Sequence, residues 1–310
     1  MKNPTTVELS RRQFLAAMGS TLALAAVPAI AADPPKRTGK PWMKLSLAAY
    51  SFNRQLERNW PKGRSKDGEM TLLDFIDFCG EMKLDGTELT GYYFPAEITS
   101  DYLAKVKHKV ADLNMEISGT AIGNDFCVAG NDARAAQIGM CKEWIDYAAE
   151  MGAPVIRIFA GNVPKGDTEQ AAIERCVSAI NECLEYAAEK KVALALENHG
   201  GITATPEQLL GIVKQVDDSP YFGINFDGGN FRTADPYGDL AKIAPFAINA
   251  QIKVAISPNG GPKQPADLGK VVDILKQANY SGYVVLEYEE PEDPRERIPV
   301  FLKELRDLIA

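Results

Sequence analysis

Four side chains able to bind a cation or move a proton stand at the ends of four separate apolar runs. They are Glu197, Asp227, Gln251 and Glu287. If the runs are consecutive parallel strands, these side chains converge, because the carboxyl ends of parallel strands lie together. Carboxylate and amide oxygens are ligands of hard divalent cations, so the pattern predicts a metal site. Two carboxylates there could also remove and return a proton next to a carbonyl.

Residues two apart on a strand share a face, so three of these donors have a companion near the rim. The companions are His199, Lys253 and Glu289. Lys253 could stabilise the negative charge that forms on a carbonyl oxygen when a neighbouring proton is removed. A glutamate at a strand end could instead form a structural ion pair with a lysine on the next strand. His199 is also open to two interpretations, a hydrogen-bonding group for the substrate or a structural side chain.

The elements that must position these residues follow a regular order. From Lys44 onward, strand-like runs alternate with helical patterns eight times. The runs cover residues 45–52, 85–90, 116–122, 155–160, 192–198, 222–227, 247–254 and 282–288. This alternation predicts a parallel sheet, and eight repeats in about 260 residues favour an α/β fold of the closed (β/α)8 TIM barrel type, as a single domain. No glycine-rich dinucleotide motif follows the first run, which argues against an open sheet.

The lengths of the expected connections indicate which end of the barrel carries the site. Links from helix to strand are short, as at residues 83–85 and 189–191, whereas links from strand to helix are long, as at 53–70 and 255–265. Ligands bind at the carboxyl ends of the strands in barrels of this type. The four oxygen donors are expected at that same end.

The first 31 residues have the features of an export signal. A twin-arginine motif, Ser10-Arg11-Arg12-Gln13-Phe14-Leu15, precedes an apolar stretch and the small-residue cleavage pattern Ala29-Ile30-Ala31. We therefore expect a signal peptide over residues 1–31, a linker over 32–43 and the catalytic barrel over 44–310. The twin-arginine translocase would deliver the protein to the periplasm or another exported location. The apolar stretch is shorter than the roughly 20 residues that span a bilayer, so no stable membrane association is expected after cleavage.

The charge of the chain excludes two classes of partner. The full chain has 34 basic and 42 acidic residues, and cleavage after Ala31 removes three basic residues and one acidic residue, which leaves a net charge of about −10. Such a surface repels nucleic acid and anionic lipid. The expected partner is a small molecule, and the sequence leaves open whether the chain forms a homo-oligomer.

The five cysteines do not form the pattern of a disulfide framework. Cys176 and Cys183 lie seven residues apart on a predicted helix, about 10 Å by helical rise, which is beyond the reach of a disulfide. We expect the cysteines to act mainly as small buried side chains.

Residues 44–310 resemble the xylose-isomerase-like TIM barrel superfamily, in its sugar phosphate isomerase/epimerase branch. In that family the metal ligands are a glutamate, an aspartate, a histidine and a glutamate after strands five to eight. The resemblance implies that Glu197, Asp227, Gln251 and Glu287 bind one divalent ion, with Gln251 in the place of the histidine. Because an amide oxygen there disfavours zinc, the implied ion is Mn²⁺, with Mg²⁺, Co²⁺ and Zn²⁺ as alternatives. The resemblance also implies that Glu197 and Glu287 form the acid/base pair.

Further side chains are expected to contact the substrate. They are Glu88, Tyr92, Trp60, Arg157, His199 and Asn230. Glu88 matches a second-strand glutamate of the family, and Asn230 stands where related epimerases often carry a histidine. Arg157 could bind an anionic or hydroxyl group, or neutralise the acidic mouth. Tyr92 and Trp60 could stack on a sugar ring or pack under their own loops.

Three functions remain open at this point. The first is a metal-dependent isomerase or epimerase that acts on a free sugar or sugar derivative through an enediolate. The second is a 3-keto-glycoside lyase or hydratase, which begins with the same proton abstraction and suits an exported enzyme. The third is a catalytically silent sugar-binding protein, which explains the missing ligand histidine but not the two retained glutamates. Endonuclease relatives are disfavoured, because the chain has two histidines and an acidic balance of charge.

Overall fold

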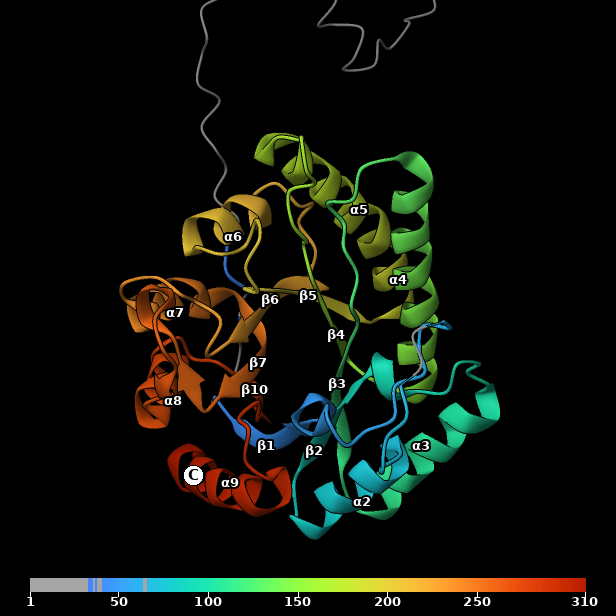
Figure 1. Ribbon diagram of the computed structural model, residues 1–310, viewed down its shortest axis with the longest axis vertical. Coiled ribbons are helices and arrows are strands. Elements are labelled where there is room, and N and C mark those ends of the chain that lie inside the picture. Colours follow the sequence, from blue (N-terminus) through green and yellow to red (C-terminus); the bar gives the residue numbers. More distant parts are fainter. Residues whose placement is uncertain (1–32, 36, 38–40, 64–65) are drawn as a thin grey trace, which may run out of the picture. The chain divides into compact units, whose positions relative to one another are not determined.

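Eight parallel strands form the frame of the molecule. The computed structural model describes residues 33–35, 37, 41–63 and 66–310, and within them the strands close into a barrel in the order β1, β10, β7, β6, β5, β4, β3, β2 (Figure 1). Their bounds are β1 Met43–Ala48, β2 Gly86–Thr90, β3 Glu116–Ala121, β4 Val155–Ile158, β5 Ala193–Glu197, β6 Phe222–Asp227, β7 Ala247–Lys253 and β10 Gly282–Glu287. This architecture confirms the predicted (β/α)8 TIM barrel.

Within the described residues, eight α-helices surround the barrel as a ring (Figure 1). Their bounds are α2 Leu72–Glu81, α3 Ser100–Asp112, α4 Asn131–Met151, α5 Glu169–Lys190, α6 Pro206–Val213, α7 Pro236–Ile243, α8 Leu268–Gln277 and α9 Pro294–Ile309. Helix α6 begins at Pro206 because the Thr205 side chain accepts a hydrogen bond from the backbone of Gln208 and the proline ring suits the first helical position.

Several short elements lie in the loops between the main strands and helices. They are the 3-10 helices η1 Ala49–Phe52, η2 Gly91–Tyr93, η3 Ala244–Phe246 and η4 Pro258–Gly260, and an antiparallel ribbon of β8 Ala255–Ile256 and β9 Gln264–Pro265. The prediction of a first strand over residues 45–52 is wrong at its end. Strand β1 stops at Ala48, and the chain then turns so that the Asn53 amide donates to the Tyr50 carbonyl. The apolar run continues past the strand because Ala49 and Phe52 stay buried after the turn.

The apolar core fills the layer between the strands and the helices. Trp144 of α4 and Phe75 of α2 are among its largest buried side chains. All five cysteines are buried free thiols, and Cys176 and Cys183 both lie on the buried face of α5. The cysteines therefore contribute to packing, as the sequence predicts.

The amino end of the barrel is contacted by the segment before β1. The predicted export signal, residues 1–31, lies outside the described residues, as do residues 36 and 38–40 of the predicted linker. Arg37 of that linker is described, and its guanidinium donates to the carbonyls of Ala247 at 2.8 Å and Pro245 at 3.1 Å. Ala247 begins β7, so Arg37 binds the end of the barrel opposite to the strand carboxyl ends.

None of the helices within the described ranges has the length and apolar character that a membrane span requires.

Candidate active site

The register of the barrel brings the predicted donors to one end. Asp227 at the end of β6 lies beside Gln251 of β7, and Lys253 at the end of β7 lies beside Glu287 at the end of β10. Glu197 ends β5, which pairs with the other edge of β6. These side chains are buried. Because side chains alternate along a strand, all five face the inside of the barrel near its carboxyl end.

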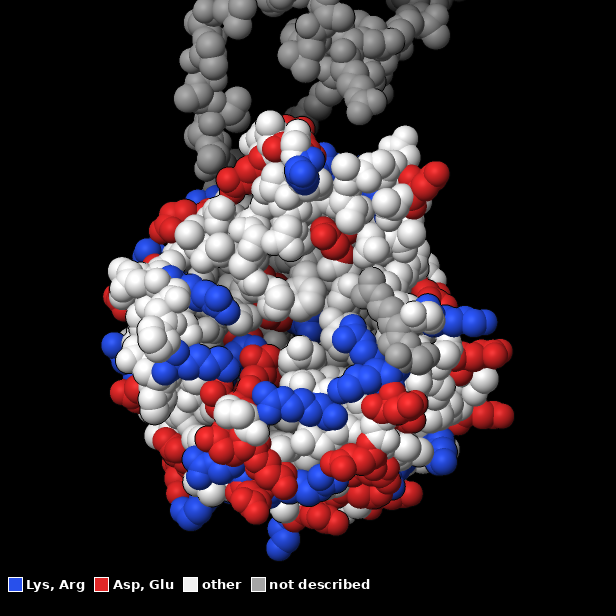
Figure 2. Space-filling model, in the orientation of Figure 1, with Lys and Arg blue, Asp and Glu red and all other residues white. Residues whose placement is uncertain are grey.

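A cavity of about 150 Å³ opens at these strand ends. It is lined by Tyr50, Tyr92, Arg157, Phe159, Glu197, His199, Lys253, Glu287 and Glu289. A smaller hollow of about 50 Å³ adjoins it, and Lys253, Glu287 and Glu289 line both. In Figure 2, acidic and basic side chains lie side by side around a hollow at the centre of the ring of helices. The cavity therefore offers a ligand both signs of charge.

Five charged residues at this level form what we call the mouth layer. They are Arg157, Glu197, Asp227, Lys253 and Glu287. At its centre the Lys253 ammonium donates a hydrogen bond of 2.7 Å to Glu287 Oε1 and lies 3.4 Å from Asp227 Oδ2. It also lies 3.0 Å from Glu289 Oε1, nearer the rim. One lysine thus faces three carboxylates from three positions in the barrel.

These contacts set the charge states around Lys253. Burial by itself would lower the pKa of Lys253, but the carboxylates, Asp227 first, raise it well above its ordinary value. Burial would raise the pKa of Glu287, yet the charge and hydrogen bond of Lys253 outweigh it and the pKa falls below its usual value. Burial raises the pKa of Asp227 to about 7, although Lys253 opposes the shift. Lys253 and Glu287 therefore form an ionised pair.

A second cation holds Glu197. Arg157 Nε lies 2.9 Å from Glu197 Oε2, and Arg157 Nη1 donates to the carbonyl of Ile122 at 2.8 Å. Asn230 Nδ2 donates to Glu197 Oε1 at 2.9 Å. Burial raises the pKa of Glu197 well above its usual range, with Arg157 opposing the shift and Asp227 adding to it. The carboxylate is held in place, and Arg157 neutralises part of the mouth, as one of its two predicted roles requires.

Aromatic rings form part of the cavity wall. The Phe159 and His199 ring centroids are 4.0 Å apart, and the Arg157 guanidinium carbon lies 3.9 Å from the Phe159 centroid. Partial loss of hydration and the charges of Arg157 and Lys253 lower the pKa of His199 to about 4. The His199 imidazole is therefore neutral near pH 7 and can donate or accept a hydrogen bond.

Beneath the mouth layer lies a second polar level, which we call the amide layer. It consists of Glu88, Asn225, Asn249 and Gln251. Glu88 accepts hydrogen bonds from Gln251 Nε2 at 2.5 Å and from Asn249 Nδ2 at 2.9 Å. Asn225 Nδ2 donates to Gln251 Oε1 at 2.7 Å and lies 3.3 Å from Glu197 Oε2, while Asn225 Oδ1 accepts from Asn249 at 2.8 Å. All four are buried, so the network connects the barrel interior to the underside of the site.

The structure separates the predicted substrate contacts into three groups. Tyr92, Arg157 and His199 line the main cavity, and Asn230 lines the adjoining hollow. Glu88 lies in the amide layer, where burial raises its pKa to about 7. Trp60 is 3% exposed and packs against Trp144 of α4, with ring centroids 4.7 Å apart and ring planes tilted by 49°. Trp60 is therefore buried and does not line the cavity.

Several residues at the site were not predicted. Tyr50 and Phe159 line the cavity, and Asn225 and Asn249 belong to the amide layer, which Asn225 connects to the mouth layer. Strand alternation carried a signal for Asn225, because it stands two residues before Asp227 and faces the same side. Tyr50 gave no such signal, since it lies in η1 beyond the end of β1.

The predicted divalent ion does not fit the side chains in this arrangement. Within the described part of the chain, no group of three or more Asp, Glu, His or Cys residues is placed to hold a metal ion. Lys253 stands between Asp227 and Glu287. Both ends of the Gln251 amide are engaged, the oxygen by Asn225 and the nitrogen by Glu88. Among the residues that the structure describes, Asp227 Oδ2 has no hydrogen-bond partner, but the Lys253 ammonium faces it at 3.4 Å.

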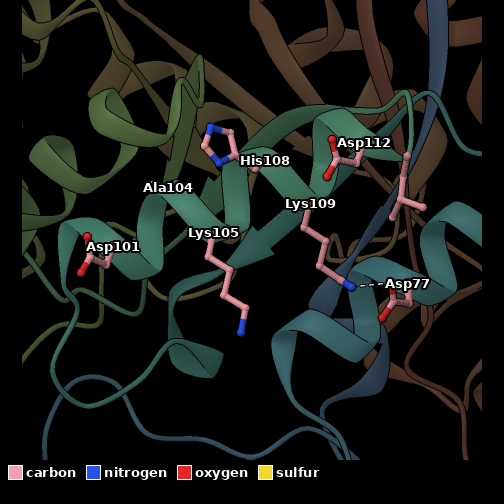
Figure 3. A pocket seen from close by; sticks show the side chains of 8 residues that line it. Asp77, Asp101, Ala104, Lys105, His108, Lys109 and Asp112 are labelled. Atoms are coloured by element: carbon pink, nitrogen blue, oxygen red, sulfur yellow. Dashed lines mark ion pairs between the residues drawn. The ribbon is translucent and has the colours of Figure 1, made fainter.

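A larger, open hollow lies away from the barrel mouth. It measures about 620 Å³ and is lined by residues of α2 and α3 and by Leu113. Figure 3 shows Lys105, His108 and Lys109 along α3, with Lys109 paired to Asp77 of α2 at 2.5 Å. His108 lies on α3 and is exposed. Acidic and basic side chains line this groove too, but they are open to water, whereas those of the mouth are buried.

Two comparisons of the sequence gave different results. The sequence model of a family described as xylose isomerase-like TIM barrel matches residues 76–305, about three quarters of the chain. No curated protein matches the sequence at a significant level.

Several solved structures share the fold. D-psicose 3-epimerase, determined in the presence of D-fructose, aligns with a TM-score of 0.70 and 16% identity, over 86% of this chain and 99% of that chain. The probable 3-DHS dehydratase AsbF from Bacillus anthracis, involved in petrobactin synthesis, aligns with a TM-score of 0.65 and 19% identity, over 85% and 99%. A xylose isomerase-like TIM barrel protein from Mycobacterium smegmatis in complex with magnesium aligns with a TM-score of 0.63 and 15% identity, over 86% and 98%. At these identities the likeness shows a common fold.

Proposed function

Because the chain belongs to the xylose isomerase-like TIM barrel family, we propose that it is an enzyme that moves a proton at the carbon next to a carbonyl of a sugar or sugar derivative. The reaction converts the sugar into its epimer or isomer. A sugar epimerase is among the proteins that share the fold over nearly the whole barrel, which supports this reaction class. The fold alone does not choose the reaction, so the proposal depends on the site.

One observation carries the proposal. Glu197 and Glu287 line the same cavity from β5 and β10, and each is next to a buried cation, Arg157 and Lys253 respectively. Proton transfer at carbon needs a base, an acid and positive charge near the oxygen that becomes negative. The four side chains provide all three functions within one cavity.

The chemistry assigned to these groups is a two-step proton transfer. Glu287 removes the proton from the carbon next to the carbonyl, and the bonding electrons move onto the carbonyl oxygen to form an enediolate. Lys253, beside Glu287, stabilises the negative oxygen. Glu197 then gives a proton to the opposite face of the same carbon and the electrons return to re-form the carbonyl, which yields the epimer. If the proton goes to the neighbouring carbon, the hydroxyl proton must also pass from one oxygen to the other, and the product is the isomer. The two glutamates exchange roles in the reverse direction.

The remaining lining is suited to a polyhydroxylated ring. The aromatic side chains of Tyr50, Tyr92 and Phe159 offer apolar surface for the C–H groups of a sugar. His199 and Asn230 offer hydrogen-bonding groups around it. A cavity of about 150 Å³ is small compared with typical ligand pockets of roughly 300–1,000 Å³, which favours a single sugar unit over an oligosaccharide.

A second reaction, elimination from a 3-keto glycoside, uses the same first step. A probable dehydratase shares the fold as fully as the epimerase does. Elimination needs a proton donor for the departing oxygen, and Tyr50 at the cavity wall has a pKa raised by burial and by Glu289, so it keeps its proton. A lyase or hydratase is therefore the alternative outcome at this site.

The place of action follows from the predicted twin-arginine signal. We propose that the protein is exported by the twin-arginine translocase and works in the periplasm or another exported location. Phosphorylated sugars are scarce there, so the expected substrate is an unphosphorylated sugar or glycoside. Fusion of residues 1–40 to a reporter that folds before export, with a control that carries Arg11→Lys and Arg12→Lys, tests this proposal. Export that survives the double substitution would contradict it.

Nuclear magnetic resonance in deuterated water tests the reaction. The protein is incubated with a panel of keto sugars and 3-keto glycosides, and the carbon that takes up deuterium is identified. Uptake next to the carbonyl with all bonds intact supports the isomerase or epimerase, whereas uptake followed by loss of the glycosidic oxygen supports the lyase. Saturable binding of a sugar without any uptake would contradict both and identify a silent binding protein.

A further inference from the structure

We propose that Lys253 supplies, as a permanent part of the chain, the positive charge that a divalent ion would otherwise bring to the barrel mouth, and that the site therefore works without a bound metal. The proposal rests on the position of the Lys253 ammonium among carboxylates on β6, on β10 and in the loop after β10. The proposal rests on the proposed function only for the effect of the ammonium on a substrate. Whether the site binds a metal can be measured without any substrate.

The first support is the match between the ammonium and its surroundings. An ammonium has three N–H donors, and three carboxylates face it, from Glu287 at 2.7 Å, Glu289 at 3.0 Å and Asp227 at 3.4 Å. A metal ion bound by Glu287 and Asp227 would lie about 2.0–2.6 Å from their oxygens. It would then meet the ammonium, and two positive charges cannot share that place. Lysine and metal are thus mutually exclusive occupants of one position.

The second support is the close packing of the Lys253 side chain. Its side chain is 11% exposed, and its methylene groups pass along the backbone of Gly229. A Cβ atom at Gly229 would lie 2.7 Å from the Ala255 carbonyl oxygen, 2.7 Å from Lys253 Cβ and 3.0 Å from Lys253 Cδ, so glycine leaves room for both the backbone of Ala255 and the lysine stem. The backbone at Gly229 thus forms one wall along the Lys253 side chain.

The third support is that the other implied ligands are committed elsewhere. Gln251 Oε1 accepts from Asn225, and its orientation is fixed because Gln251 Nε2 must face the acceptor Glu88. Glu197 receives Arg157 and Asn230. Metal binding would require these hydrogen bonds to break together.

The geometry also leaves Lys253 able to act on a substrate. The contact with Asp227, at 3.4 Å, is longer than the 2.7–3.2 Å of an ordinary hydrogen bond. The N–H on that side can therefore turn to a substrate oxygen, because Lys253 lines the cavity. An ammonium can polarise a carbonyl through charge and a hydrogen bond together.

Binding of Mn²⁺ alone tests the proposal. The full chain is treated with EDTA, desalted and titrated with Mn²⁺, and free Mn²⁺ is followed by electron paramagnetic resonance. The variants are Lys253→Met, which removes the charge at similar length, and the control Lys242→Met, which removes an exposed lysine paired with Glu207 and Asp239 on the outside. Circular dichroism confirms folding of each.

We expect wild type and Lys242→Met to show no saturable site below about 1 mM, which is the weak end of protein sites for divalent ions. Lys253→Met should bind Mn²⁺ at least about tenfold more tightly. One tightly bound Mn²⁺ per wild-type chain, at micromolar affinity, would overturn the proposal, and so would a folded Lys253→Met that gains no affinity. If Lys253→Met does not fold, Lys253→Gln replaces it. Tight binding of Mn²⁺ by the wild-type chain would still overturn the proposal.

Discussion

The mouth layer and the amide layer both contain buried carboxylates, but the partners of these carboxylates differ. In the mouth layer Glu287 and Glu197 face the cations Lys253 and Arg157. In the amide layer Glu88 faces two neutral amides, from Asn249 and Gln251. Both layers lie inside one barrel, so differences in burial do not account for the choice.

The difference follows from what each layer must do. An amide donates a hydrogen bond without adding charge. Two such bonds satisfy the single carboxylate of Glu88, which does not line the cavity. Several carboxylates that gather at a cavity repel one another, so cations must accompany them. The same cations can then stabilise charge on a ligand. We propose that the mouth layer acts on the substrate and that the amide layer holds the mouth layer in position.

The largest effect is expected when Glu287 loses its ability to accept a proton. Glu287→Gln keeps the shape and one acceptor oxygen, but it should lower the rate of proton exchange by about 10²–10⁴-fold, as loss of a general base does. Substrate binding, measured by calorimetry, should change little. Glu197→Gln should behave in the same way if the two glutamates share acid and base duties.

A smaller effect of a different kind is expected in the amide layer. Glu88→Gln places an NH₂ group where Glu88 now accepts from Gln251 and Asn249, so one buried donor loses its partner. The free energy of unfolding should fall by about 1–3 kcal/mol. Urea denaturation followed by circular dichroism measures it. An unchanged midpoint would mean that the amide layer does not stabilise the barrel.

Glu289 should matter less than Glu287, although both contact Lys253. Its side chain is 29% exposed, so water screens its charge. Glu289→Gln should reduce the exchange rate by no more than about tenfold, equivalent to about 1.4 kcal/mol. A loss as large as that of Glu287→Gln would show that the rim carboxylate takes part in proton transfer.

The outer groove between α2 and α3 provides the smallest expected effect. Lys109→Ala removes the ion pair with Asp77, in which both side chains are partly exposed. Stability should change by no more than about 0.5 kcal/mol, and the exchange rate should stay the same. A loss of exchange here would move the site away from the mouth.

The sequence predicted the barrel because its strands repeat an apolar run and a helical pattern at regular intervals. The predicted run 222–227 matches β6 Phe222–Asp227, and the run 282–288 exceeds β10 by one residue. The first run failed at its end because burial continued into η1 without a strand. Periodicity reports burial, and it cannot tell a buried strand from a buried turn.

The sequence predicted which side chains lie together at the site better than it predicted which of their atoms are in contact. Strand-end position brought Glu197, Asp227 and Glu287 together, and alternation added Lys253. Which atoms meet depends on the register between strands, and the sequence does not state it. The register sets Lys253 beside Glu287, as in the structural ion pair that the sequence left open. The sequence predicted a divalent ion at the position that Lys253 takes between Asp227 and Glu287, and the Mn²⁺ titration decides between the two.

The central claim is that the two layers have separate duties, and a matched pair of substitutions tests it most directly. Glu287→Gln and Glu88→Gln make the same chemical change in different layers, so deuterium uptake next to the carbonyl is measured for both in EDTA-treated protein. We expect uptake to fall by about 10²–10⁴-fold for Glu287→Gln. The folded fraction of Glu88→Gln should retain uptake within about tenfold of wild type. Equal losses in the two variants, or a greater loss for Glu88→Gln, would contradict the account.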